Sequence, residues 1–180
     1  MHEEIIFSGF GGQGALFAGQ LLTYAALDEG REVTWIPSYG PEMRGGTAHC
    51  TVIISDEPIG SPIIRNPTAA VVLNPASMDK YEPLVKPGGI LVVNSSLVPK
   101  PATRADITVV TIPANDIAIE VGDVRMSNVV LLGALLGTKE IVRPESLRKA
   151  MDEHIPARKA RFIEPNKRAL QRGLDHVAQQ

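Results

Sequence analysis

The sequence contains a single cysteine, Cys50, among its 180 residues. One thiol cannot form an internal disulfide, hold an iron–sulfur cluster or complete a thiolate zinc site. Any iron–sulfur centre that works with this chain is therefore expected on another chain. The four histidines are scattered, with no pair at metal-ligand spacing, so no metal site is expected here.

The sequence also lacks a strong charge excess and a long apolar run. Its 18 Lys and Arg residues nearly balance 20 Asp and Glu residues, and the formal net charge is −2. A nucleic-acid-binding protein needs a basic excess, so no nucleic-acid partner is expected. No apolar run approaches the roughly 20 residues of a membrane span, and the acidic start is unlike a signal peptide. These absences predict a soluble, cytoplasmic protein.

The length is that of one domain, and residues 1–180 are expected to fold as a single unit. Short apolar stretches rich in β-branched residues alternate with helix-like segments. The alternation predicts an α/β fold, with a Rossmann-like, mainly parallel, doubly wound sheet flanked by helices and a helical C-terminal portion. Strands are expected at 5–7, 33–36, 48–54, 69–73, 90–93 and 107–112, and helices at 16–27, 76–85, 129–136, from Pro144 and from about Pro165. The helix over 129–136 is apolar all round and is therefore expected to be buried.

The strongest local signal is a glycine motif between the first strand and the first helix. Gly9, Gly11 and Gly14 have the spacing G-x-G-x-x-G, and the motif also contains Gly12 and Gln13. Glycine lets the backbone turn tightly and approach a ligand, and the helix N-terminus behind it presents free N–H groups to a phosphate. A tight strand–helix crossover, in which the glycines serve packing alone, is the alternative interpretation.

A dinucleotide site would need a carboxylate at the end of the second strand, where it holds the ribose hydroxyls. Here that strand ends in Pro37 and Ser38, and Glu32 lies at its start. The glycine motif is therefore interpreted as a phosphate or anion cradle without a full dinucleotide pocket.

A second polar run, from Ser38 to Thr47, leaves the second strand at the carboxyl edge of the sheet, where ligands bind in such folds. Its candidate binding residues are Ser38, Tyr39, Glu42, Arg44, Gly45 and Gly46. Arg44 is suited to hold a phosphate or carboxylate bidentately, and Glu42 to orient Arg44 or a partner. The alternative interpretation is a surface loop whose charges are solvated.

The basic residues are unevenly distributed. Between Arg143 and Arg172 there are nine Lys or Arg residues and four acids, a local balance of +5. A pair of solvated helices and a docking face for a more acidic partner subunit are both consistent with this balance. Cys50 lies in an apolar strand pattern and is expected to be a buried small hydrophobe.

The two loops taken together resemble a known family. SGFGGQG at 8–14 and SYGPEMRGGTA at 38–48 resemble the gamma subunit of the 2-oxoacid:acceptor (ferredoxin) oxidoreductases. The segment from Ser127 to Leu136, with Gly133 and Ala134, and the total length are also similar to that family. The resemblance covers essentially the whole chain.

The resemblance implies a component of an enzyme that oxidatively decarboxylates pyruvate, 2-oxoglutarate, a branched-chain 2-oxoacid or indolepyruvate and passes the acyl group to coenzyme A. It places thiamine diphosphate, Mg and the iron–sulfur clusters on partners, namely thiamine-binding alpha and beta subunits and a ferredoxin-like delta subunit. It associates the gamma subunit with coenzyme A binding and with assembly of the complex. No catalytic residue is expected on this chain.

The expected coenzyme A site combines both loops with Asn128, which begins the buried helix and is expected to reach the same edge. Residues 9–14 are expected to receive an anionic part of the ligand, and residues 38–46 to close over the ligand or an interface. Two other functions stay open: a stand-alone Rossmann-type nucleotide-binding enzyme and a purely structural assembly subunit. An isolated chain of this kind is also expected to be able to form a homodimer through the surface that its partners cover.

Overall fold

The structure is a computed structural model that describes residues 1–40 and 46–180. Within these residues six strands form one mixed sheet in the order β2-β3-β1-β4-β5-β6. The strands are β1 (His2–Phe10), β2 (Glu32–Tyr39), β3 (Thr47–Ser55), β4 (Ala69–Val72), β5 (Ile90–Asn94) and β6 (Thr108–Ile112). β3 is antiparallel to both of its neighbours, and the pairs β1–β4, β4–β5 and β5–β6 are parallel. The expected mainly parallel sheet is confirmed, with β3 as the exception.

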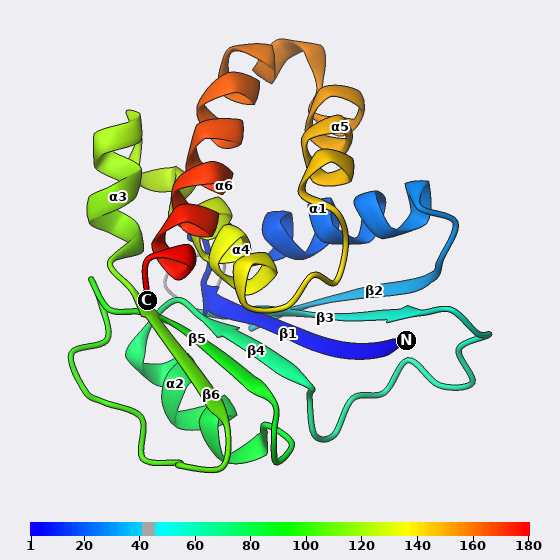
Figure 1. Ribbon diagram of the computed structural model, residues 1–180, viewed down its shortest axis with the longest axis vertical. Coiled ribbons are helices and arrows are strands. Elements are labelled where there is room, and N and C mark those ends of the chain that lie inside the picture. Colours follow the sequence, from blue (N-terminus) through cyan, green and yellow to red (C-terminus); the bar gives the residue numbers. More distant parts are fainter. Residues whose placement is uncertain (41–45) are drawn as a thin grey trace.

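The helices cover the two faces of the sheet unequally. They are α1 (Ala15–Asp28), α2 (Pro75–Tyr81), α3 (Ala114–Val121), α4 (Ser127–Thr138), α5 (Pro144–His154) and α6 (Ile163–Ala178), with short 3-10 helices η1 (Glu82–Leu84), η2 (Val124–Met126) and η3 (Ala157–Phe162). Figure 1 shows α2 on one face and the other α-helices on the opposite face. Side chains alternate along β1, so Ile5 and Phe7 join the large core under α1 and α4, and Ile6 joins the smaller core under α2. No helix in the described part of the chain is long and apolar enough to span a membrane.

The differences from the expected elements lie mostly at their ends. β2 continues to Tyr39 and β3 begins at Thr47, so Ser38 and Tyr39 belong to a strand and not to a loop. β3 is antiparallel because only residues 40–46 connect it to β2, and a parallel crossover needs a dozen or more residues. α2 is shorter than expected, since Pro83 lacks the N–H that an α-helix needs and the chain continues as η1.

The expected buried helix is confirmed as α4, in which every residue from Ser127 to Leu136 is buried. α4 packs against α6 closely enough for their backbones to touch. A Cβ added at Gly133 would overlap the carbonyl oxygen of Leu170, and one added at Gly173 would lie 2.9 Å from the Gly133 Cα and overlap the Val130 carbonyl oxygen. Glycine at these two positions therefore determines how near α6 lies to α4.

We expect Gly173→Ala to lower the free energy of unfolding by about 1–2 kcal/mol, because the backbone overlap outweighs the roughly 1 kcal/mol gained in helix propensity. Urea denaturation followed by circular dichroism measures the change. Gly60→Ala is the control, because its added Cβ meets nothing within 4 Å. Equal unfolding midpoints for the two variants would show that the helices do not depend on this contact.

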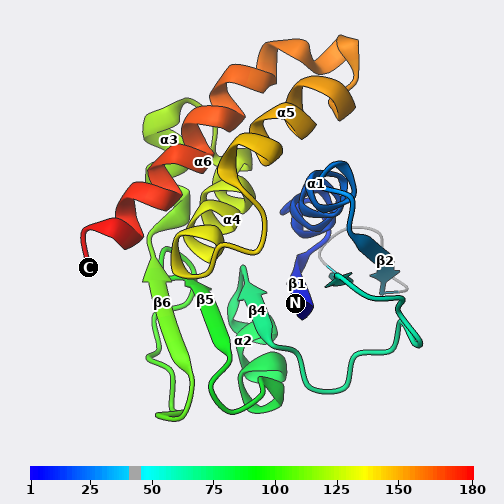
Figure 2. The same ribbon diagram turned by 45° about the vertical axis from the view of Figure 1, so that its right-hand side comes forward.

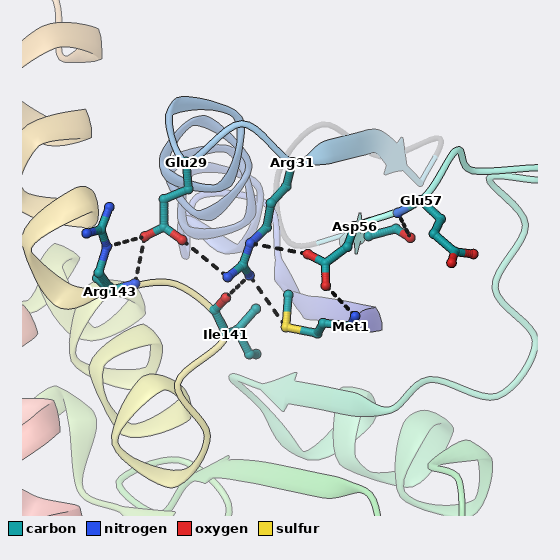
Figure 3. A network of polar contacts seen from close by, with 8 residues as sticks. Met1, Glu29, Arg31, Asp56, Glu57, Ile141 and Arg143 are labelled. Carbon is teal, nitrogen blue, oxygen red and sulfur yellow. Dashed lines mark hydrogen bonds and ion pairs between the residues drawn. The ribbon is translucent and has the colours of Figure 1, made fainter.

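A charged network ties the end of α1 to the α4–α5 connection at the amino edge of the sheet (Figure 3). Glu29, whose side chain is 7% exposed, lies 3.4 Å from Arg31 and accepts a 2.8 Å hydrogen bond from the Arg143 backbone N–H. Arg31 also donates to the Ile141 carbonyl oxygen and pairs with Asp56 at 3.7 Å. Burial by itself raises the pKa of Glu29, but hydrogen bonds from Ser146 and Arg143 and the charge of Arg31 outweigh it, and the pKa is lowered from 4.5.

A carboxyl group whose pKa is lowered by folding stabilises the fold above its unfolded pKa and loses that effect as the pH falls through its folded pKa. We therefore expect Glu29→Gln to lower the free energy of unfolding by about 1 kcal/mol at pH 7. The difference from the wild type is expected to shrink as the pH falls from 5 toward 3. Glu140→Gln, at an exposed residue of the α4–α5 connection, is the control and is expected to have a small effect on stability. A constant difference for Glu29→Gln across this range would contradict the assignment.

Candidate functional site

The carboxyl edge of the sheet contains a point where the chain leaves neighbouring strands toward opposite faces. β1 and β4 are adjacent and parallel, with Ser8 opposite Val72. The chain after β1 enters α1 on the large-core face, and the chain after β4 enters α2 on the other face (Figure 1). Open α/β sheets bind ligands in the crevice at such a switch point. The glycine motif follows β1 directly at this switch point.

The glycines of the motif are required for different reasons. Gly12 and Gly14 have φ of 98° and 79°, a left-handed conformation that side chains disfavour. Gly9 is buried, and a Cβ there would lie 2.7 Å from the Gln13 Oε1 and 3.1 Å from the Leu73 Cβ. Gly12 is exposed, and a Cβ there would meet nothing within 4 Å. The packing interpretation therefore holds for Gly9, whereas Gly12 presents its backbone to open space.

The Gln13 side chain holds the loop in this shape. Its Oε1 accepts hydrogen bonds from the Phe10 backbone N–H at 2.7 Å and from the Asn74 Nδ2 at 3.0 Å. Asn74 in turn accepts a 2.9 Å hydrogen bond from the Ser77 N–H and so caps α2. The side-chain Oε1 of Gln13 therefore links the loop that leaves β1 to the loop that leaves β4.

Asn128, which the sequence places at the same edge as the glycine motif, contacts the start of α1. Asn128 is 3% exposed, and its Nδ2 donates to the Gly14 carbonyl oxygen at 2.9 Å. Gly14 is the N-cap of α1 and has no side chain with which to cap the first turn. The N–H groups of that turn therefore receive no partner from their own N-cap residue.

The β2–β3 hairpin reaches the same edge and contacts the glycine motif. The Gly11 N–H donates to the Gly46 carbonyl oxygen at 2.9 Å, which joins the two sequence motifs through the backbone. Ser38 and Tyr39 are consecutive strand residues, so their side chains project to opposite faces. Tyr39, 72% exposed, shares its face with Trp35, which is partly buried and packs against the core under α1. Glu42, Arg44 and Gly45 lie outside the described residues.

Two asparagines at this edge were not identified from the sequence. Asn74 directly follows β4, and Asn94 ends β5, donating to the Asn115 Oδ1 at 2.9 Å and accepting from the Ala114 N–H at 3.2 Å. Both are 1% exposed and hold together the turns that leave the sheet. An asparagine at the end of a fully apolar strand pattern is the signal that indicates them.

Among the described residues near the edge, Cys50 and His49 do not form a catalytic pair. Cys50 is fully buried in β3, and burial raises the pKa of its thiol to about 12. His49, the next residue, is half-buried, and burial together with the positive charge of Lys80 lowers its pKa. His49 and Cys50 project to opposite faces of β3, so the histidine is not placed to activate the thiol.

We expect Cys50 to be unreactive toward Ellman's reagent at pH 8 in the folded protein, because the thiolate is the reacting species and is scarce there. One thiol per chain is expected to react after unfolding in urea. Absorbance at equal protein concentration with and without urea measures both states. Rapid stoichiometric reaction of the folded chain would show that the thiol is accessible and ionised.

One group of side chains in the described part of the chain has the spacing of metal ligands. Asp28, Glu153 and His154 bring one ligand atom each within 4.8 Å of one another, and all three are exposed. These residues come from α1 and α5 and lie far apart in the sequence, so no spacing motif indicates them. Exposed acidic groups commonly meet without an ion, and the group is not assigned a metal.

Comparison with known proteins agrees with the fold and the resemblance. A model of the pyruvate ferredoxin/flavodoxin oxidoreductase family matches residues 4–176. The chain is 40% identical to the 2-oxoglutarate synthase subunit KorC of Methanocaldococcus jannaschii, over 87% of this chain and 85% of that subunit. It is 38% identical to the ketoisovalerate oxidoreductase subunit VorA of Methanothermobacter thermautotrophicus, over 96% of this chain. The chain spans only 36% of the length of that VorA subunit.

Solved structures show the same fold. The gamma subunit of a keto/oxoacid ferredoxin oxidoreductase from Geobacter sulfurreducens superposes with a TM-score of 0.84 at 33% identity, covering 99% of both chains. A 2-oxoglutarate:ferredoxin oxidoreductase from Magnetococcus marinus, solved with 2-oxoglutarate, coenzyme A and succinyl-CoA, has a TM-score of 0.89 at 22% identity. The match covers 99% of this chain and 31% of that chain.

Proposed function

The chain belongs to the pyruvate ferredoxin/flavodoxin oxidoreductase family, and we propose that it is the gamma component of a 2-oxoacid:ferredoxin oxidoreductase that binds coenzyme A. The observation that carries the proposal is the start of α1. There an exposed Gly12 and a helix without a side-chain cap lie at the switch point of the sheet. The hydrogen bond from the Gly11 N–H to the Gly46 carbonyl oxygen joins the glycine motif to the β2–β3 hairpin.

The chemistry of this edge suits a phosphate ester. The N–H groups at a helix N-terminus and the positive end of the helix dipole favour an anion, and glycine lets it approach the backbone. Coenzyme A carries a diphosphate between its adenosine and its pantetheine arm. We assign the diphosphate to residues Gly11–Gly14, and the pantetheine arm to the hairpin side of the edge. Among the hairpin residues, Arg44 is proposed to contact an anionic group, with Glu42 and Gly45 beside it in the sequence.

The remaining chemistry belongs, in this proposal, to partner subunits. The only cysteine is buried with its pKa raised, so the chain offers no set of thiolates for an iron–sulfur cluster. We propose that thiamine diphosphate with Mg is held by alpha and beta subunits and that the clusters are held by a ferredoxin-like delta subunit. The assembly is proposed to work in the cytoplasm. This chain then contributes no catalytic residue and positions the acyl acceptor.

A stand-alone dinucleotide-dependent enzyme fits the edge less well. Glu32 begins β2 and therefore lies at the amino edge of the sheet, away from the glycine motif. The residues that end β2, Ser38 and Tyr39, supply no carboxylate for ribose hydroxyls. A purely structural subunit is the other alternative, and a pair of glycine variants separates it from a ligand-binding one.

We expect Gly12→Ala in the assembled enzyme to raise the KM for coenzyme A about tenfold, because a methyl group displaces the phosphate from the N–H groups. The decarboxylation half-reaction, which does not need coenzyme A, is expected to be unchanged. Both are measured by reduction of the electron acceptor with pyruvate, 2-oxoglutarate and 2-oxoisovalerate as trial substrates.

Gly30→Ala is a matched control. Gly30 has φ of 80°, and an added Cβ there also meets nothing within 4 Å, so the backbone strain is comparable to that at Gly12. Gly30 follows α1 at the amino edge, far along the helix from the motif. Both variants are expected to lose similar stability, and only Gly12→Ala is expected to change the KM for coenzyme A. An unchanged KM in Gly12→Ala would rule out ligand binding at the motif and favour the structural subunit.

A further inference from the structure

A hollow of about 360 Å³ lies at the amino edge of the sheet, beside the connection between β3 and β4 (residues 56–68). It is separate from a larger cavity of about 520 Å³ beside α1, which Phe17, Lys159 and Phe162 help to line. Figures 1 and 2 show the β3–β4 connection extending outward from the sheet. This edge is opposite the one that carries the glycine motif.

The β3–β4 connection is longer than the fold requires. β3 and β4 both pair with β1, where Ser55 at the end of β3 is opposite His2 and Ala69 at the start of β4 is opposite Ile5. The ends of the connection are therefore roughly 15 Å apart at the same edge, a distance that about five residues can span. In compact domains, connections longer than about 12 residues without a helix or strand are uncommon, and ordered ones usually serve a function.

The centre of the connection is apolar and exposed. Residues 58–64 have the sequence PIGSPII, in which no residue is charged. Ile64 packs against the smaller core, whereas Ile63 is 73% exposed, the largest exposed fraction among the large apolar side chains of the described residues. Pro58 and Pro62 are exposed as well. One isoleucine thus anchors the connection to the core, and the next is presented to solvent, as is typical of a contact with another molecule.

The backbone of the connection has few partners of its own. Within the described residues, no N–H or C=O group from Glu57 to Asn66 forms a hydrogen bond with another backbone group. The hydroxyls of Ser55 and Ser61 accept from the N–H groups of Glu57 and Ile63. The other main-chain groups are available for hydrogen bonds to a segment of another protein, which is a common means of recognition.

The hollow beside Ile63 has an excess of positive charge. It is lined by Glu4, Ser61, Ile63, Arg65, Asn66 and Lys86. Lys86 pairs with Glu4 at 2.5 Å, so these two charges offset each other. Arg65 is exposed, and it forms no ion pair with the described part of the chain. A carboxylate on an occupant of the hollow would pair with Arg65.

We propose that the β3–β4 connection docks onto a partner subunit of the oxidoreductase, with Ile63 inserted in an apolar pocket of that subunit and Arg65 paired with one of its carboxylates. The inference rests on the proposed function and adds to it a contact surface at the amino edge. The matching region makes up 36% of the VorA subunit and 31% of the Magnetococcus marinus chain, so further polypeptide accompanies this fold in both relatives. An apolar anchor beside an arginine is typical of the few residues that supply most of the binding energy of an interface.

Ile63→Asp is expected to weaken association of this chain with the other subunits about tenfold or more, because a charge is excluded from an apolar pocket. Arg65→Glu is expected to weaken it severalfold, and less at high salt. Each variant is titrated into the enzyme prepared without this chain, and acceptor reduction is followed at saturating coenzyme A. An excess of either variant is expected to restore the full rate with an unchanged KM for coenzyme A, which distinguishes docking from ligand binding.

Two matched controls make the same changes elsewhere on the surface. Ile119→Asp replaces an isoleucine of α3 that is 61% exposed, and Arg158→Glu reverses the charge of an exposed arginine of η3. Both are expected to associate like the wild type, and all four variants to melt near the wild-type temperature, because the side chains are exposed. Equal weakening by a variant of the connection and its control would overturn the assignment of the contact to this connection.

Photo-crosslinking identifies the occupant directly. With p-benzoylphenylalanine in place of Ile63, irradiation of the assembled enzyme is expected to link this chain to a partner subunit near an Asp or Glu. A link only to a second copy of this chain, or no link in fully assembled enzyme, overturns the inference. Failure here is distinguishable from failure of the proposed function. Normal association of Ile63→Asp together with a raised KM for coenzyme A in Gly12→Ala removes only this docking surface.

Discussion

The burial of α4 from Ser127 to Leu136 is the constraint on which the rest of the structure depends. A helix that is apolar on every side must be covered on every side, and the sheet covers only one of them. α6, α3 and α1 cover the others, and α6 approaches so closely that Gly133 and Gly173 touch through their backbones. The C-terminal helices are therefore part of the core and not an appendage to the sheet. Their position also makes the wall of the cavity beside α1.

The same helix positions the candidate site. Asn128 in the first turn of α4 is buried by its neighbours, and its amide reaches across to the Gly14 carbonyl oxygen. This hydrogen bond holds the N-terminus of α1 in place, while Gln13 and Asn74 hold the loop in front of it. The backbone contact between Gly11 and Gly46 then brings the hairpin to the same edge. The residues that make these hydrogen bonds come from different parts of the chain. The conformation of the loop around Gly12 therefore depends on the whole fold.

Some polar groups in this protein are hydrogen-bonded within the chain, and others are exposed to solvent. Glu29, Gln13, Asn74 and Asn94 are committed to partners within the chain, and their role is to hold elements together. The backbone of Gly12 and the side chains of Arg158, Lys159 and Arg161 in η3 are exposed to solvent. The exposed backbone of Gly12 at the start of α1 supports the proposed binding of an anionic co-substrate.

The sequence by itself determined the α/β class, through the alternation of strand and helix patterns. It also determined the buried helix and the buried cysteine, through apolar patterns, and the two loops that carry the resemblance, through their motifs. Each of these features depends on a local pattern. Asn128 was expected at the same edge as the glycine motif, but its hydrogen bond to Gly14 was not expected. Ser38 and Tyr39 were expected in a loop, because the end of a strand depends on its pairing with a neighbouring strand, here β3. The meeting of Phe17, Lys159 and Phe162 around one cavity was decided by tertiary structure alone. These contacts join residues far apart in the chain, and only the packing of α1, α4 and α6 brings such residues together.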